Sequence, residues 1–228
     1  MFEDRREAGT ALAAEIASLG LADPLVLALP RGGVPVAAEI ARVLNAPLDV
    51  VIVRKVGAPG NPELAIAAIV DGTPPDVVLN RSIVEAYGLE EDEIAILVQR
   101  ERPELDRRRN AYRGKRRALS LTGKSVIVVD DGAATGTTMK VVLRALRRRA
   151  PRELIVALPV APAETLAELE QEADRVVCLR IPERFRALGH HYRHFAQLTD
   201  EEVTDALHEA SERRKAARVS MFGAARTK

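Results

Sequence analysis

Short runs of branched apolar residues alternate along this chain with longer stretches of helical periodicity. A strand buried on both faces of a parallel sheet is apolar throughout, so such runs predict strands. Strands are expected at 25–29, 49–53, 64–70, 126–129, 153–158 and 175–179. Between them, stretches such as 2–19 and 34–44 place apolar residues on one helical face. The alternation predicts an α/β fold, a mostly parallel twisted sheet flanked by helices.

Three segments depart from this alternation. Residues 56–64 are rich in Gly and Pro, which predicts a mobile loop. Residues 81–117 are strongly charged with a partial apolar stripe, which predicts a helical insertion. Residues 211–228 are basic and rich in Ala, and we expect a disordered tail there. Residues 1–210 then form one domain.

Composition limits the binding partners and the cellular compartment that we expect for this chain. The chain has 228 residues, with 34 basic and 33 acidic side chains and a net charge of +1, a balance that disfavours a generic polyanion binder. The single cysteine excludes an internal disulfide and suits a reducing compartment. No apolar stretch approaches the roughly 18 residues of a membrane span, and the N-terminus has no signal-like segment. We expect a cytoplasmic protein without a membrane partner.

The most informative segment is 126–138, VIVVDDGAATGTT. An apolar strand is followed by two carboxylates, a turn of small residues and the start of a helix. Unpaired amides at a helix N-terminus bind phosphate well. The predicted phosphate-binding loop comprises Ala134, Thr135, Gly136, Thr137 and Thr138. The threonines add hydroxyl donors, and the glycine lets the backbone approach the ligand.

Asp130 and Asp131 lie too close to this loop to bind a second anion. As hydrogen-bond acceptors they suit a ribose diol, with each charge-assisted bond contributing about 1.5–3 kcal/mol. Together, the carboxylates and the loop predict a ligand that is a sugar carrying a phosphate. A strand-to-helix turn in another α/β protein, with one aspartate capping the helix, is the alternative.

Two further strand ends carry suitable residues. Arg31, Gly32 and Gly33 follow the first strand, and Arg54 and Lys55 follow the second. Ligands of parallel sheets bind beyond the carboxyl ends of the strands, so we expect all three ends to form one site. Glycine amides and an arginine fork suit a second phosphate group. Each pair also has a plainer interpretation, as a tight turn and as solvated basic residues.

The 126–138 segment resembles the signature of type I phosphoribosyltransferases: four apolar residues, two acidic ones, three variable ones and Thr-Gly-x-Thr. The resemblance implies that phosphoribosyl pyrophosphate (PRPP) is bound, with Mg²⁺ carried by PRPP and no direct protein metal site. It implies ribose binding and charge stabilisation by Asp130 and Asp131, and pyrophosphate binding by Arg31, Gly32 and Gly33. Arg54 and Lys55 resemble the pair that opens the catalytic loop of orotate phosphoribosyltransferases, which makes Lys55 a catalytic candidate. The resemblance also implies a homodimer and a small hood, from the N-terminal helix and about 180–200.

The acceptor is less well defined. The segment 181–195 resembles the one in hypoxanthine-type enzymes where a phenylalanine stacks on the purine, and Phe185 matches that position. The aromatic cluster there could equally pin the hood to the core. Glu63 is a further candidate to approach the base. The aspartate that acts as general base on 6-oxopurines in related enzymes is replaced by Ala134. Either another group does this work or the acceptor is not a 6-oxopurine.

These features predict a phosphoribosyltransferase that transfers to a nucleobase-like acceptor, as in purine or pyrimidine salvage. Residues 1 to about 200 also resemble a group of stand-alone bacterial phosphoribosyltransferase-like proteins of unassigned acceptor. The alternative is a non-catalytic, PRPP-sensing regulator that binds nucleic acid through the arginines of 107–117 and 147–149. Few aromatic residues accompany these arginines, which disfavours nucleic acid. A third possibility is a domain whose acceptor is delivered by another protein.

Overall fold

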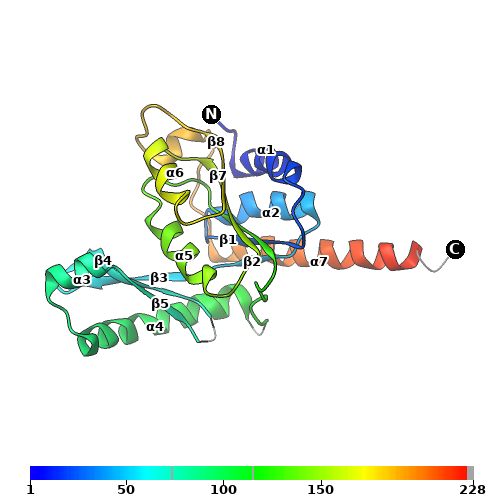
Figure 1. Ribbon diagram of the computed structural model, residues 1–228. Helices are drawn as coiled ribbons and strands as arrows, with labels where there is room; N and C mark the ends of the chain where they lie inside the picture. The colour runs from blue at the N-terminus through cyan, green and yellow to red at the C-terminus, as the bar shows by residue number, and fades with distance from the viewer. Residues whose placement is uncertain (73, 115, 225–228) are drawn as a thin grey trace.

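The computed structural model describes residues 1–72, 74–114 and 116–224, without the side chains of Glu63 and 218–224. A five-stranded sheet in the order β2-β1-β6-β7-β8 lies at its centre (Figure 1). All four neighbouring pairs are parallel. The strands are β1 (Pro24–Ala28), β2 (Leu48–Val50), β6 (Ser125–Val129), β7 (Glu153–Val160) and β8 (Arg175–Arg180). The predicted α/β fold with a parallel sheet is confirmed.

Helices cover both faces of this sheet (Figure 1). Helices α1 (Arg5–Ser18) and α2 (Gly33–Leu44) lie on one face, and α5 (Thr137–Arg147) and α6 (Ala163–Leu169) on the other. Successive residues of a strand point to opposite faces. Ile127 therefore packs in the α1–α2 core and Val128 in the α5–α6 core. Burial on both faces is the reason that the strands are continuous apolar runs.

A smaller antiparallel sheet lies beside the parallel one, with the order β3-β4-β5. Its strands are β3 (Val53–Ala58), β4 (Asn61–Val70) and β5 (Asp76–Leu79). The prediction of a mobile loop over 56–64 is wrong, because these residues end β3, turn at Gly60 and begin β4. The ladder pairs the backbone, and Val56 and Ala58 are buried. These gains outweigh the turn-forming composition.

The predicted helical insertion is present as α3 (Arg81–Tyr87) and α4 (Glu91–Arg113). Its apolar stripe, which includes Ile94, Val98 and Leu105, is buried where α4 packs against β3, β4 and α7 (Asp200–Ala224), in a cluster continuous with the α1–α2 core. The last residue of α4, Arg113, is buried in an ion cluster. Its guanidinium donates to Asp49 Oδ1 (3.2 Å), to the Val50 carbonyl (2.9 Å) and to the Asp71 carboxylate. The cluster fixes the insertion to β2 and to the end of β4.

The chain ends in a long helix, α7 (Asp200–Ala224), which extends away from the sheet (Figure 1). Val203 and Leu207 anchor its first turns in the core. The expected boundary at residue 210 falls inside this helix. Residues 211–224 of the tail predicted to be disordered are helical, and residues 225–228 lie outside the described part. Ala, Arg, Glu and Lys are good helix formers, so an anchored helix can continue through them. Among the described residues, no helix is long and apolar enough to cross a membrane.

Candidate active site

The two adjacent carboxylates occupy a tight turn at the carboxyl end of β6. The Asp131 amide donates to Asp130 Oδ1 (2.9 Å), and the Ala133 amide donates to the Val160 carbonyl (3.0 Å), which ties the turn to β7. Burial and the neighbouring charge of Asp131 raise the pKa of Asp130 well above its usual value. The turn therefore holds a carboxylate whose ionisation depends on nearby charge.

The predicted phosphate loop connects this turn to α5. Gly136 adopts the left-handed conformation (φ +62°), and α5 begins at Thr137. The first amides of a helix have no partner within it. Ala134, Thr135 and Thr137 are exposed, and the Thr165 hydroxyl fixes the loop by donating to the Ala134 carbonyl (2.7 Å). The loop thus presents donors toward solvent at the end of the sheet, as an anion site requires.

The turn after β1 packs directly on the carboxylates. A Cβ added to Gly32 would lie 2.1 Å from Asp131 Oδ2, and one added to Gly33 would lie 2.5 Å from the Val129 carbonyl oxygen. Only glycine permits this approach. The Pro30–Arg31 peptide is cis, and the half-buried Arg31 lies 3.8 Å (Nη1) from Asp200 Oδ1. Two of the three predicted strand ends therefore do meet.

The third pair differs from the prediction. Arg54 and Lys55 lie within β3 and not at the end of a strand of the parallel sheet, because the hairpin continues the chain. Arg54 Nε is 2.5 Å from Glu101 Oε2 of α4. Lys55 lines a groove of about 710 Å³ together with Thr137 and Thr138 of the phosphate loop. Lys55 thus shares a groove with the end of the phosphate loop, whereas Arg54 pairs with α4. The side chain of Glu63 is outside the described part.

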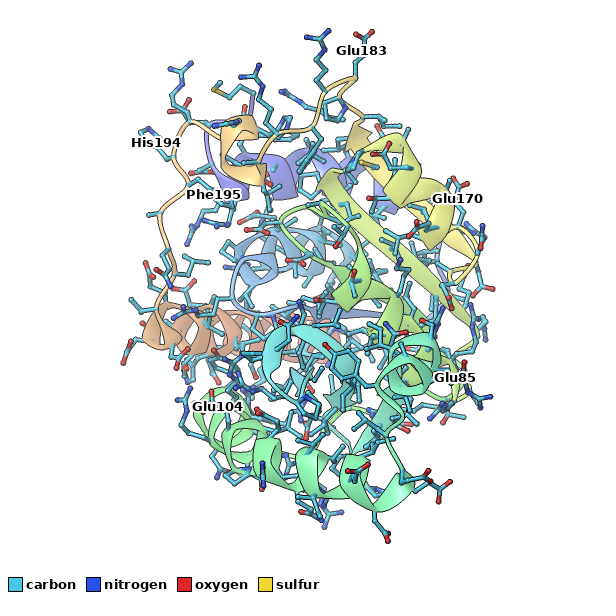
Figure 2. The ribbon with its side chains drawn as sticks, turned by 90° about the vertical axis from the view of Figure 1, so that its left-hand side faces the viewer. Glu85, Glu104, Glu170, Glu183, His194 and Phe195 are labelled. Atoms are coloured by element: carbon cyan, nitrogen blue, oxygen red, sulfur yellow. The ribbon has the colours of Figure 1, made fainter. Side chains whose placement is uncertain are left out.

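The aromatic residues near the C-terminal end make different contacts. The ring of Phe185 stacks on His191, with centroids 5.3 Å apart. Tyr192 is buried and stacks on Phe195 (5.0 Å). A pocket of about 290 Å³ beside the carboxylates has Phe195 as its aromatic ring. Its lining residues are Arg5, Arg31, Gly32, Asp131, Phe195, Ala196, Gln197 and Leu198. The Tyr192 hydroxyl donates to the Asp131 carbonyl, and Phe195, which Figure 2 labels, lines the pocket beside the carboxylates, whereas Phe185 is not among its lining residues.

Sequence reasoning missed two charged residues of the site. Arg5 of α1 donates from Nε to Asp131 Oδ2 (2.7 Å). Asp200 at the start of α7 accepts from the Tyr112 hydroxyl (2.5 Å) and lies near Arg31. Neither stands in a motif, and each lies far along the chain from its partner. No pattern in the sequence marks either residue.

The arginines that suggested a nucleic-acid surface are largely paired within the molecule. Figure 2 shows Glu104 on α4, where it pairs with two of them. The remaining partners are the carboxylates of Asp49, Asp71, Asp76, Asp106, Asp174 and Asp200. Hydrogen bonds from Arg107 and Arg108 lower the pKa of Glu104 to about 2. These contacts account for much of the positive charge without a polyanionic partner.

Comparisons with known proteins agree with the geometry. The family model described as the phosphoribosyl transferase domain matches residues 3–192. Proteins from two strains of Mycobacterium tuberculosis, CDC 1551 and H37Rv, provisionally named phosphoribosyl transferases, are 41% identical over 210 residues, 92% of this chain. This chain spans about half (47%) of their length. The crystal structure of TT1426 from Thermus thermophilus is 44% identical, with a TM-score of 0.82 over 92% of this chain and 98% of that one. The chain thus belongs to the phosphoribosyl transferase domain family.

Proposed function

We propose that this chain is a phosphoribosyltransferase that binds PRPP with Mg²⁺ and transfers the phosphoribosyl group to a nucleobase-like acceptor, releasing pyrophosphate. The observation that carries the proposal is the approach of Gly32 to the Asp131 carboxylate, where an added Cβ would lie 2.1 Å from Oδ2. This packing puts a candidate pyrophosphate turn beside the candidate ribose carboxylates. The phosphate loop continues from the same carboxylates.

The roles follow from the order of these groups along the ligand. The 134–138 loop would hold the 5-phosphate, and Asp130 and Asp131 would accept the ribose hydroxyls. Their negative charge would also favour the positive charge that develops on the ring. With the phosphate fixed, the anomeric carbon can move toward the acceptor while the rest of the sugar stays in place.

The leaving group needs positive charge. Arg31 and the amides of Gly32 and Gly33 would bind pyrophosphate, and Lys55 would approach from the hairpin. Arg54 would have to leave Glu101 to contribute. Bond cleavage at the anomeric carbon pushes charge onto the pyrophosphate, so these cations would act most strongly in the transition state.

The donor set of the site fits a metal ion carried by the ligand. Asp131 Oδ2 is already paired with Arg5, and the described residues offer no cluster of three or more His, Cys, Asp or Glu suited to a metal. Mg²⁺ retains waters and binds phosphate oxygens readily. Held by PRPP, it would neutralise charge on the pyrophosphate.

We also propose a cytoplasmic homo-oligomer acting in base salvage.

The acceptor pocket lies between Phe195 and the turn at Gly32. Tyr192 and the Arg5 guanidinium already pack on the Phe195 ring, so this ring would meet an acceptor at its edge. Ala134 leaves the phosphate loop without the carboxylate that serves 6-oxopurine substrates. The test is pyrophosphate release from PRPP and Mg²⁺ over a panel of adenine, guanine, hypoxanthine, xanthine, uracil, orotate and nicotinate. Release that depends on one class of base, and is lost in Asp130→Asn/Asp131→Asn, supports a transferase. PRPP binding without release for any base would favour the PRPP-sensing regulator.

A further inference from the structure

The hood consists of the N-terminal residues and of residues 191–194, which lie near the other end of the domain. The Phe2 amide donates to the His191 carbonyl (2.8 Å), and the Arg193 amide donates back to the Phe2 carbonyl (2.8 Å). The His194 amide donates to the Glu3 carbonyl (2.9 Å). The N-terminal residues and 191–194 therefore form one hydrogen-bonded unit, which lies above the end of the parallel sheet.

This unit contacts Asp131 at two points. The Tyr192 hydroxyl donates to the Asp131 carbonyl (2.5 Å), and Arg5 Nε donates to the Asp131 carboxylate at Oδ2 (2.7 Å). The side chains of Arg5 and Asp131 are only 11% and 10% exposed. Charge-assisted bonds of this length in a partly buried setting are strong and geometrically specific. The backbone and the carboxylate of one residue are thus both held by the hood.

Arg5 also makes contacts that fix its own position. Its Nη1 donates to the Ala196 carbonyl (2.9 Å), and its guanidinium carbon lies 3.9 Å from the centre of the Phe195 ring. An arginine held by a carboxylate, a carbonyl and an aromatic face has little rotamer freedom left. Arg5 thus joins Asp131 to the chain segment that lines the acceptor pocket.

We propose that Arg5 and Tyr192 are positioning residues, which orient the Asp131 carboxylate for the ribose hydroxyls and couple it to the hood. With Oδ2 held by Arg5, the ribose hydroxyls would bind at the other carboxylate oxygen, Oδ1. The proposal rests on the proposed function, because it assigns the ribose to this carboxylate. It adds two residues that belong to neither the phosphate loop nor the turn at Gly32.

The arrangement has an electrostatic consequence. In the described part of the chain, the charged and titratable groups near the carboxylate pair include Arg5 from α1, Tyr192 from the hood, Arg31 from the turn after β1 and, beside Tyr192, Arg180 from β8. Arg5 favours the ionised form of Asp130, whereas Asp131 opposes it. Loss of the Arg5 charge would raise the pKa of Asp130 further. An aspartate accepts ribose hydroxyls best when ionised, so PRPP binding would then require a higher pH.

The test compares PRPP binding in Mg²⁺ by isothermal titration calorimetry across pH for wild type and four variants. Arg5→Met removes the charge, Arg5→Lys keeps it without the fork, and Tyr192→Phe removes one hydroxyl while keeping the ring. Arg6→Met is the matched control, since Arg6 is the next residue of α1 and is exposed. Circular dichroism confirms that each variant is folded.

We expect Arg5→Met to weaken PRPP binding about tenfold, the effect of losing one charge-assisted bond, and to move the midpoint of the pH profile upward. Arg5→Lys should keep the wild-type midpoint with weaker binding, and Arg6→Met should match wild type. A folded Arg5→Met with wild-type affinity and midpoint overturns the proposal. If Arg5→Met does not fold, Arg5→Lys and Tyr192→Phe decide: weaker binding supports it, and unchanged binding overturns it. Wild type that fails to bind PRPP overturns instead the proposed function.

Discussion

The buried ion cluster at Arg113 gives the sharpest stability prediction. Arg113 is 7% exposed, and the side chains of Asp49 and Asp71 are 9% and 3% exposed. Arg113→Met fills similar space but leaves two carboxylates in a site that water barely reaches. Asp71 keeps a second partner, since Arg109 Nε is 2.6 Å from its Oδ1. Asp49 keeps only a bond from the Val50 amide within this cluster.

The size of the destabilisation follows from the groups that Arg113→Met leaves without a partner. Three hydrogen bonds from the guanidinium are lost, two of them to carboxylates. Breaking a buried pair by removing one partner costs about 3–5 kcal/mol, because an unpaired charge remains. For a domain of this size each kcal/mol lowers the melting temperature by about 2–4 °C, so we expect a drop of ~6–20 °C.

The assay is urea denaturation followed by circular dichroism. Arg116→Met is the matched control, because Arg116 is exposed and donates to the carbonyls of Tyr112 and Arg113 rather than to a carboxylate of the cluster. We expect it to lose less than about 1 kcal/mol, as surface substitutions usually do. The double variant Arg113→Met/Asp49→Asn should recover part of the loss, since Asp49 is then neutral and Asp71 keeps Arg109 as its partner. Equal stabilities for Arg113→Met and Arg116→Met would refute the reasoning.

Three further substitutions test the site itself. Gly33→Ala should cost about 1–3 kcal/mol in urea denaturation and weaken PRPP binding, because its Cβ would meet the backbone oxygen of Val129; unchanged stability contradicts the packing. Asp130→Asn should stabilise the fold, measured by urea unfolding against pH. The raised pKa of Asp130 means that the unfolded chain binds fewer protons, so the gain grows as pH rises from 3.8 through that raised pKa and vanishes only below 3.8. A gain that grows toward acid pH would show the opposite sign of shift. Thr165→Val should remove the hydrogen bond to the Ala134 carbonyl, costing about 0.5–1.5 kcal/mol and weakening PRPP binding in calorimetry; binding as tight as wild type would show that Thr165 does not order the loop.

The parallel sheet could be predicted from the sequence because its signal is local. Strands such as 126–129 are buried on both faces, and a continuous apolar run has few other interpretations. The turns after β1 and β6 were predictable for the same reason, since glycine and paired carboxylates stand next to strands. Their meeting follows from the rule that parallel strands end at one edge.

The remaining features depend on partners distant in the chain. The composition of 56–64 favours a turn, yet pairing between β3 and β4 decides that most of it is strand. The helix over 211–224 depends on the anchoring of its first turns by Val203 and Leu207. Arg5 and Asp131 are 126 residues apart in the chain, and no local sequence pattern near either residue predicts their contact. The local sequence therefore predicts where the motifs lie, but it does not predict which distant side chains contact them.

The central claim is that the carboxylates after β6 and the loop that follows them bind PRPP. The most direct measurement is calorimetric titration of the wild-type chain with PRPP in Mg²⁺, beside Asp130→Asn/Asp131→Asn. We expect saturable binding to wild type and a loss of at least about 100-fold in the folded double variant, as two charge-assisted contacts disappear. No binding to wild type, or equal binding to both proteins, would contradict the account.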